Sequence, residues 1–150
     1  MEAPKCRLLL VDDCEDDALL IRFAFGKVGR ADSLFWLPGG RHAIDYLSGK
    51  GLYADRDKFP FPDVMLLDVN MPEIDGYDVL KWVRGDARFR SLPVVMFATS
   101  PLLKHIELAY DLGANSYLTK PTEFRRFTKT LVETANFWLD CCRLPSSAKR

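Results

Sequence analysis

Acidic side chains and one lysine stand at the ends of apolar segments that lie far apart in the sequence. Asp12 and Asp13 follow the run that ends at Val11, Asp68 follows a second run, and Lys120 follows a third segment. If these segments are neighbouring parallel strands, their carboxyl ends meet at one edge of a sheet, where ligands bind in open sheets. The sequence therefore predicts a site with three carboxylates and one ammonium group.

The charges of this site indicate its chemistry. Three carboxylates in one pocket raise each other's pKa or require a cation. Oxygen ligands favour a hard ion, and Mg²⁺ suits the site because it keeps positions for water or phosphate oxygens. A magnesium ion beside Lys120 suits phosphoryl transfer, since both cations neutralise phosphoryl oxygens. Asp68 is the predicted nucleophile, because it lies centrally and an aspartate can form an acyl phosphate.

Two kinds of apolar segment alternate along the chain. Short continuous runs predict strands that are buried on both faces, as in a parallel sheet. Between them, apolar residues recur at helical spacing, with acids at 15–17 as a start signal and Gly113 as a stop signal. The predicted strands are 8–11, 33–37, 64–67, 94–97 and 116–119, and the predicted helices are 15–25, 41–47, 77–83, 102–112 and 122 to about 140.

The segments follow the order strand then helix five times. This alternation implies right-handed crossovers and an α/β fold, a doubly wound parallel sheet with helices on both faces. The 150 residues predict one domain over 1–150, with a core from about 5 to 140. We expect one long loop at 48–62 and a flexible tail at 143–150.

Composition narrows the function classes. The 21 basic and 21 acidic residues cancel, which gives no electrostatic reason to expect nucleic acid or a membrane surface as partner. No apolar run approaches the roughly 20 residues of a membrane span, and the N-terminus shows no secretory pattern, so we expect a cytoplasmic location. The cysteines match no zinc or haem spacing and predict free thiols, although the adjacent pair could instead cross-link two chains under oxidation. They are Cys6, Cys14, Cys141 and Cys142.

The same residues resemble a known family. The segment 66–72, Leu-Leu-Asp-Val-Asn-Met-Pro, followed by Asp75-Gly76, resembles the phosphorylation motif of two-component response regulators. Asp12-Asp13 resembles their acidic pair, and Lys120-Pro121 resembles their lysine, with a cis peptide bond implied before the proline. The resemblance implies the flavodoxin-like receiver fold, with strand order 2-1-3-4-5 and five helices. It also implies that a histidine kinase phosphorylates Asp68 in a magnesium-dependent phosphorelay.

The resemblance assigns roles by position. Asp13 and Asp68 would bind Mg²⁺ directly, and Asp12 would act through water. Asn70 would offer its backbone carbonyl to the metal, and its side chain would border the path of the hydrolytic water. Lys120 would contact the phosphoryl group.

Ala98 departs from the family pattern. The family carries Thr or Ser at this position, and that hydroxyl couples the phosphoryl oxygen to an aromatic residue that changes rotamer, here Tyr117. Thr99 could substitute only if the strand end is irregular, because successive strand side chains point to opposite faces. A lost hydrogen bond to a charged group is worth about 1.5–3 kcal/mol. We expect phosphorylation to survive and the conformational response to be weakened or rewired.

A narrower resemblance concerns the partners. Residues 110–120 and 137–140 resemble the single-domain response regulators that partner phytochrome histidine kinases. This implies a sensor histidine kinase as partner, with a phytochrome as one candidate, and a histidine phosphotransfer protein as a second recipient. In that subfamily the aromatic C-terminal helix takes part in homodimerisation, whereas packing within the monomer is the alternative here. The interface candidates are Phe137, Trp138 and Leu139.

Two other functions stay open. A phosphorylation-independent pseudo-receiver, acting as an interaction module, is supported by Ala98 and opposed by the intact acidic and lysine residues. A phosphatase with an aspartyl nucleophile needs a second aspartate two positions later. That position is Asn70, so we do not expect an enzyme. Elsewhere, Asp75-Gly76 indicates only a turn, and Thr99-Ser100 indicates the start of a helix.

Overall fold

The centre of the fold is a parallel sheet of five strands. The computed structural model describes residues 7–145, so Cys6 and the end of the expected tail lie outside the described residues. The strand order is β2-β1-β3-β4-β5, and this confirms the predicted order 2-1-3-4-5. The strands are β1 Leu8–Val11, β2 Leu34–Leu37, β3 Val64–Asp68, β4 Val94–Ala98 and β5 Ser116–Thr119.

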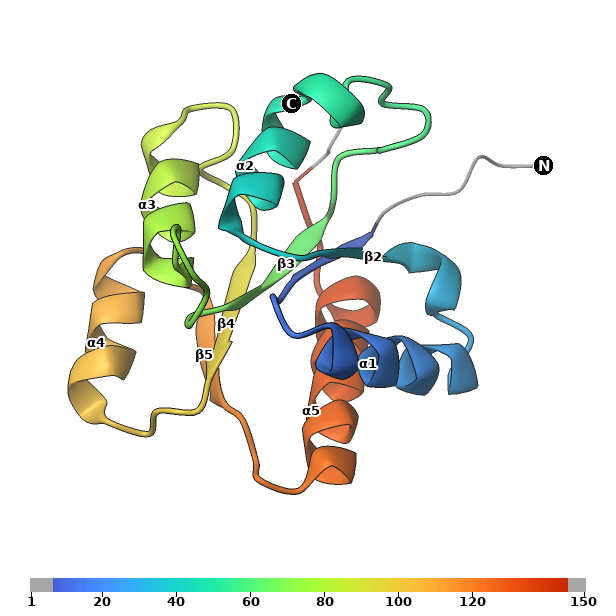
Figure 1. Cartoon of the computed structure of the whole chain (residues 1–150), viewed down its shortest axis with the longest axis vertical. Coiled ribbons are helices and arrows are strands. Elements are labelled where there is room, and N and C mark those ends of the chain that lie inside the picture. Colours follow the sequence, from blue (N-terminus) through green and yellow to red (C-terminus); the bar gives the residue numbers. More distant parts are fainter. Residues whose placement is uncertain (1–6, 146–150) are drawn as a thin grey trace.

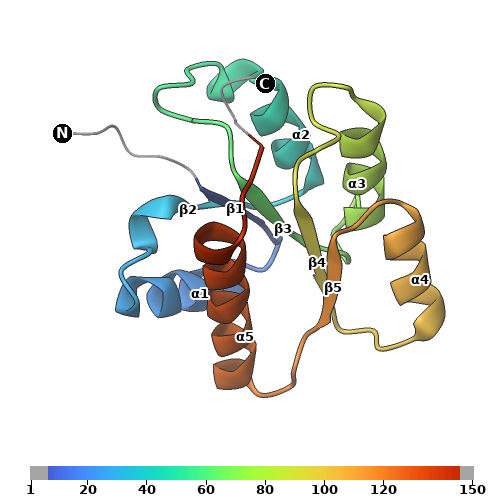
Figure 2. The same cartoon turned by 180° about the vertical axis from the view of Figure 1, so that it is seen from behind.

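Helices cover both faces of the sheet. Figures 1 and 2 show α1 and α5 side by side on one face, with α2, α3 and α4 on the other. β1, β3 and β4 are buried along their whole length, which explains their continuous apolar runs. No helix in the described part of the chain has the length and apolar character to cross a membrane. The helices are α1 Glu15–Lys27, α2 Gly40–Ser48, α3 Gly76–Gly85, α4 Leu103–Asp111 and α5 Phe124–Asn136.

The C-terminal helix differs from its prediction. The helix was expected to run from 122 to about 140, but α5 ends at Asn136 and gives way to a π-helical turn, Phe137–Cys141. Two arginines bind this end of the helix. Arg7 Nη2 donates to the Leu139 carbonyl at 3.3 Å, and Arg30 donates to the Asn136 side chain at 2.7 Å and forms an ion pair with Asp140. Arg7 thus satisfies a backbone carbonyl that a helix end leaves without an intrahelical partner, and Arg30 holds two side chains of the same turn.

The predicted long loop is folded against α2. It starts with a 3₁₀ turn, Gly51–Tyr53. The Arg56 guanidinium then donates to the carbonyls of Tyr46 and Leu47, each at 2.7 Å, at the end of α2. The Tyr46 hydroxyl donates in turn to the Pro60 carbonyl at 2.7 Å.

A second 3₁₀ turn, Ala31–Ser33, precedes β2.

Candidate metal and phosphoryl site

The predicted acidic residues meet at the carboxyl end of the sheet. Asp68 is the last residue of β3, and Asp12 and Asp13 directly follow β1, its neighbour in the sheet. One carboxylate oxygen from each of the three lies within 4.8 Å of the others. Lys120 follows β5, and its Nζ lies 3.4 Å from Asp68 Oδ1. The structure therefore brings all four residues together.

Asp12 is completely buried, at 0 % exposure. Its Oδ1 accepts the Cys14 backbone N–H at 3.0 Å, whereas its Oδ2 has no hydrogen-bond partner among the described residues. Burial raises the pKa of Asp12, while the Cys14 N–H and then Lys120 act in the opposite direction. A buried carboxylate oxygen without a partner is costly, so this residue fits a site that receives a cation.

Burial and a nearby positive charge also act in opposite directions on the pKa of Asp68. It is 4 % exposed. Burial raises the pKa of Asp68 to about 7, the Lys120 ammonium lowers it, and the neighbouring Asp12 raises it. A divalent cation would favour the ionised form of both carboxylates. The ligands are all oxygens, and this donor set fits Mg²⁺.

Lys120 is confined by aromatic rings and by a second carboxylate. Its Nζ lies 4.9 Å from the ring centroid of Phe97 and 5.7 Å from that of Phe127, within the range of cation–π attraction. It also lies 4.0 Å from Asp17 Oδ2, on α1. From the sequence, Asp17 was expected only to be one of the acids that start a helix. The signal was its place in the first turn after the acidic pair, but only the structure shows which acid of that turn reaches Lys120.

Gly76 was also missed, because Asp75-Gly76 indicated only a turn. A Cβ atom at Gly76 would lie 2.4 Å from the Asp68 carbonyl oxygen and 2.8 Å from Val69 Cα, so a larger residue would push α3 away from the backbone that carries Asp68. Asp75 caps α3, because its side chain accepts the Asp78 N–H at 2.9 Å while the Asp78 side chain accepts the Asp75 N–H at 3.2 Å. The start of α3 thus lies directly against the end of β3, which carries Asp68.

The end of β4 is regular. Ala98 pairs with Thr119 of β5 in the strand register and is buried, whereas Thr99 is exposed. β4 is therefore regular up to Ala98, and we find no irregularity in these residues that would let Thr99 replace the missing hydroxyl. Asn70, two residues after Asp68, is exposed at the same edge of the sheet. The cis bond implied before Pro121 is wrong, because every peptide bond of the described residues is trans.

Tyr117 is bound to the segment that follows β4. Its hydroxyl donates to the Ser100 carbonyl at 2.9 Å. The Ser100 hydroxyl lies 2.5 Å from His105 Nδ1 and accepts the Leu102 N–H at 3.2 Å. The helix was expected to start at Thr99-Ser100, but α4 begins at Leu103, and Ser100 binds the turn before it. The Tyr77 hydroxyl donates to the His105 carbonyl at 3.1 Å. These bonds connect β5, α4 and α3.

The three aromatic and aliphatic residues after α5 differ in exposure. Phe137 is 55 % exposed, and its ring contacts Trp138 edge to face. Trp138 is half-buried and packs against the core on the α1 and α5 side. Leu139 is 7 % exposed and belongs to that core. Leu139 is therefore occupied within the monomer, and this corrects its place among the interface candidates.

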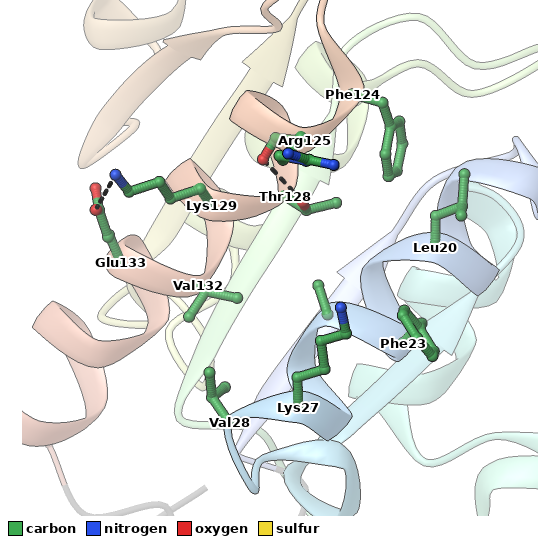
Figure 3. A pocket seen from close by; sticks show the side chains of 11 residues that line it. Leu20, Phe23, Lys27, Val28, Phe124, Arg125, Thr128, Lys129, Val132 and Glu133 are labelled. Carbon is green, nitrogen blue, oxygen red and sulfur yellow. Dashed lines mark hydrogen bonds and ion pairs between the residues drawn. The ribbon is translucent and has the colours of Figure 1, made fainter.

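A groove separates α1 from α5 on the outer face. Figure 3 shows side chains of both helices pointing toward one another across it. Its volume is about 470 Å³. The apolar lining is Leu20, Phe23, Ala24, Val28, Phe124 and Val132, and the cationic side chains are Lys27, Arg125 and Lys129. It includes none of the predicted site residues.

Comparison with known proteins decides the family. The model of the response regulator receiver domain matches residues 8–132. The chain belongs to the response regulator receiver family. Rcp1 of Synechocystis is 30 % identical over 93 % of each chain. A protein of Methanothrix harundinacea, named as a probable methanogenesis regulatory protein, FilR2, is 35 % identical over 94 % of this chain and 88 % of its own.

Solved receiver structures show the same fold. The phosphorylated cyanobacterial phytochrome response regulator RcpA has a TM-score of 0.85 and 32 % identity, covering 97 % of this chain and 100 % of its own. The Mn²⁺-bound form of Rcp1 has a TM-score of 0.81, 30 % identity and coverage of 93 % and 98 %. As a receiver domain, the chain is a signalling protein rather than an enzyme. Its triad Asp12, Asp13 and Asp68 is typical of the divalent-metal site of receivers.

Because these buried carboxylates lie close together, their negative charge should lower the free energy of unfolding. Without metal at pH 8, Asp68→Asn should raise the free energy of unfolding on the order of 1 kcal/mol. The pKa of Asp68, raised to about 7, shows that the folded state favours its neutral form. The wild type gains stability as the pH falls from 7 toward 4, so the difference should close over that range. Urea unfolding at several pH values measures it.

Mg²⁺ should reverse the order of stability, so that the wild type becomes more stable than Asp68→Asn. A hundredfold excess of the ion over its Kd should stabilise the wild type by about 2.7 kcal/mol. Asp68→Asn should gain less, because one carboxylate ligand is replaced. Asp16→Asn, a change on the exposed first turn of α1, is the control and should keep the wild-type gain. A wild-type unfolding midpoint that does not respond to Mg²⁺ would contradict the metal site.

Proposed function

We propose that the chain is a phosphorylation switch that accepts a phosphoryl group on Asp68 from the phosphohistidine of a sensor kinase. One observation carries this proposal: the buried Asp68 carboxylate lies within reach of two further acids and of the Lys120 ammonium. The membership of the receiver family supports it. The proposed output of this receiver domain is contact with another protein.

The proposed transfer uses the chain's own groups. An Asp68 carboxylate oxygen attacks phosphorus as the phosphorus–nitrogen bond to the kinase histidine breaks, and the released imidazole takes up a proton from water. The product is an aspartyl phosphate, and the Lys120 ammonium balances part of its charge. Asp13, Asp68 and the Asn70 carbonyl would hold Mg²⁺, with Asp12 acting through water. The bound ion would supply neutralisation of the phosphoryl oxygens.

The proposed partner is a sensor histidine kinase, and a phytochrome kinase is the leading candidate. RcpA, one of the similar structures, is described as a cyanobacterial phytochrome response regulator. Return of the phosphoryl group to a histidine phosphotransfer protein is a second route of output. The alternative is a pseudo-receiver that works without phosphorylation, and it is favoured by Ala98 alone.

Phosphoryl uptake separates the two functions. With labelled acetyl phosphate and Mg²⁺, the wild type should take up phosphoryl on Asp68, because the nucleophile, the cation ligands and Lys120 are in place. Asp68→Asn and chelation of the metal should each abolish the label. Asp86→Asn changes an acid whose side chain pairs with Arg88 on the surface, and it should label like the wild type. Absence of label on the wild type would favour the pseudo-receiver.

We propose that Ala98 weakens the coupling between the phosphoryl group and Tyr117. The buried Ala98 side chain offers no hydroxyl to a phosphoryl oxygen, and Thr99 is exposed. Tyr117 is bound to the Ser100 carbonyl, so the response would depend on the backbone of this segment.

Restoring the hydroxyl should strengthen the response. In Ala98→Thr, beryllofluoride with Mg²⁺ should shift the backbone NMR resonances of α4 and β5 further than in the wild type. A hydrogen bond to a charged group contributes about 1.5–3 kcal/mol, enough to move a two-state equilibrium. Ala98→Val controls for the added volume and should respond like the wild type. Equal shifts in Ala98→Thr and the wild type would show that the hydroxyl is not the missing element.

We also propose a homodimer interface at the end of α5. Phe137 is a large apolar side chain with 55 % exposure. Beside it lies a hollow lined in part by Leu118 of the edge strand β5, Thr134 of α5 and Trp138 of the π-helical turn. A second copy that covers this region would remove apolar surface from water.

Phe137→Ser should shift the chain toward monomer. Sedimentation over a range of concentrations, with reducing agent to exclude cross-linking through Cys141 or Cys142, measures the association. Leu52→Ser is the matched control, because Leu52 is 71 % exposed and lies in the loop after α2. A wild type that stays monomeric with and without beryllofluoride would refute the interface.

A further inference from the structure

We propose that Asp17 is a positioning residue that competes with Asp68 for the Lys120 ammonium and so limits how strongly Lys120 binds the phosphoryl group. This inference rests on the proposed function, in which Lys120 contacts that group. Asp17 lies outside the motifs at 12–13, 66–76 and 120–121 that resemble the family.

The distances show the competition. Lys120 Nζ lies 3.4 Å from Asp68 Oδ1 and 4.0 Å from Asp17 Oδ2. The Lys120 side chain is only 15 % exposed, and the Asp17 side chain is 30 % exposed. Water screens such a pair less than it screens a pair on the open surface. The ammonium group is therefore held between two carboxylates that come from different elements, β3 and α1.

The aromatic rings keep the ammonium in this place. Phe97 of β4 and Phe127 of α5 both lie within cation–π distance of Nζ. A lysine on the open surface would simply move to its better partner. Because the rings confine Lys120, a change at Asp17 alters the balance of charge on the ammonium rather than releasing the side chain to solvent.

Asp17 differs from the other acids around it. The oxygens that cluster within 4.8 Å come from Asp12, Asp13 and Asp68, and Asp17 is not among them. Asp16, its neighbour in the first turn of α1, is exposed and forms no ion pair within the described part of the chain. A role limited to stabilising the helix start would be common to all three first-turn acids, Glu15, Asp16 and Asp17.

The consequence has a definite sign. When a phosphoryl group or its analogue occupies the site, the Asp17 carboxylate draws the ammonium away from it and repels its negative charge. Neutralising Asp17 should therefore strengthen binding of the analogue and slow loss of the phosphoryl group. A partly exposed ion pair of this kind corresponds to a change of about two- to fivefold in an equilibrium constant.

Beryllofluoride affinity tests the inference. In saturating Mg²⁺, Asp17→Asn should bind beryllofluoride about two- to fivefold more tightly than the wild type. Asp17→Glu, which keeps the charge, should stay closer to the wild type. Asp16→Asn is the matched control and should match the wild type. Raising the salt concentration should erase long-range charge effects while leaving most of the Asp17 effect.

Two further readouts exclude a merely structural or metal-ligand role. The Mg²⁺ affinity of Asp17→Asn should stay within about twofold of the wild type, because a change of charge outside the ligand set has only a small effect. The side-chain NMR resonances of Lys120 should shift in Asp17→Asn and not in Asp16→Asn, even without metal or beryllofluoride.

The outcomes keep this inference apart from the proposed function. If the wild type binds no beryllofluoride and the Lys120 resonances do not shift in Asp17→Asn, the proposed function and the role of Asp17 are both overturned. If the wild type binds it and Asp17→Asn behaves like Asp16→Asn, only the role of Asp17 is overturned. A large loss of Mg²⁺ affinity in Asp17→Asn would also overturn it, because Asp17 would then act on the metal.

Discussion

The burial of two carboxylates beside one another is the constraint on which the site depends. Asp12 and Asp68 lie at the ends of adjacent strands and are almost completely removed from water. Burial raises the pKa of both residues, and a single confined ammonium offsets only part of the cost. The metal-free domain therefore carries an unfavourable charge arrangement in its folded state. A divalent cation is a ligand of the kind that relieves this arrangement, because it favours the ionised form of both carboxylates.

The fold maintains this arrangement from several sides. β1 and β3 pair in parallel register, which places the two carboxylates at one edge. The Trp36 indole N–H donates to the Asp12 carbonyl at 2.7 Å and holds the end of β1. Gly76 lets α3 approach the backbone of Asp68. The unfavourable charges thus sit on rigid elements, where they cannot relax by moving apart.

The sequence was sufficient for the fold and for the main site residues. Continuous apolar runs reveal buried strands, and the fixed geometry of parallel strands brings Asp12, Asp68 and Lys120 to one edge. Family resemblance supplied the strand order, which alternation alone leaves open. The contact of Asp17 with Lys120 could not be predicted in the same way. Three acids follow one another at 15–17, and the exact rotation of α1 decides which of them faces Lys120. The close approach at Gly76 is equally invisible in sequence, since it depends on how α3 packs on β3.

Ala98 raises the question of how such a site could signal. The route through a hydroxyl is missing, but Lys120 offers another connection. Its side chain contacts Asp68, and its backbone N–H donates to the Ala98 carbonyl at 2.7 Å. The segment after Ala98 leads to Ser100, whose carbonyl accepts the Tyr117 hydroxyl. A movement of Lys120 toward a phosphoryl group would thus act on the end of β4 through the backbone. Coupling of this kind needs an element with two arrangements. The segment from Ala98 to Ser100 is the place to look for such an element, because it links the site to Tyr117 on one side and to α4 on the other.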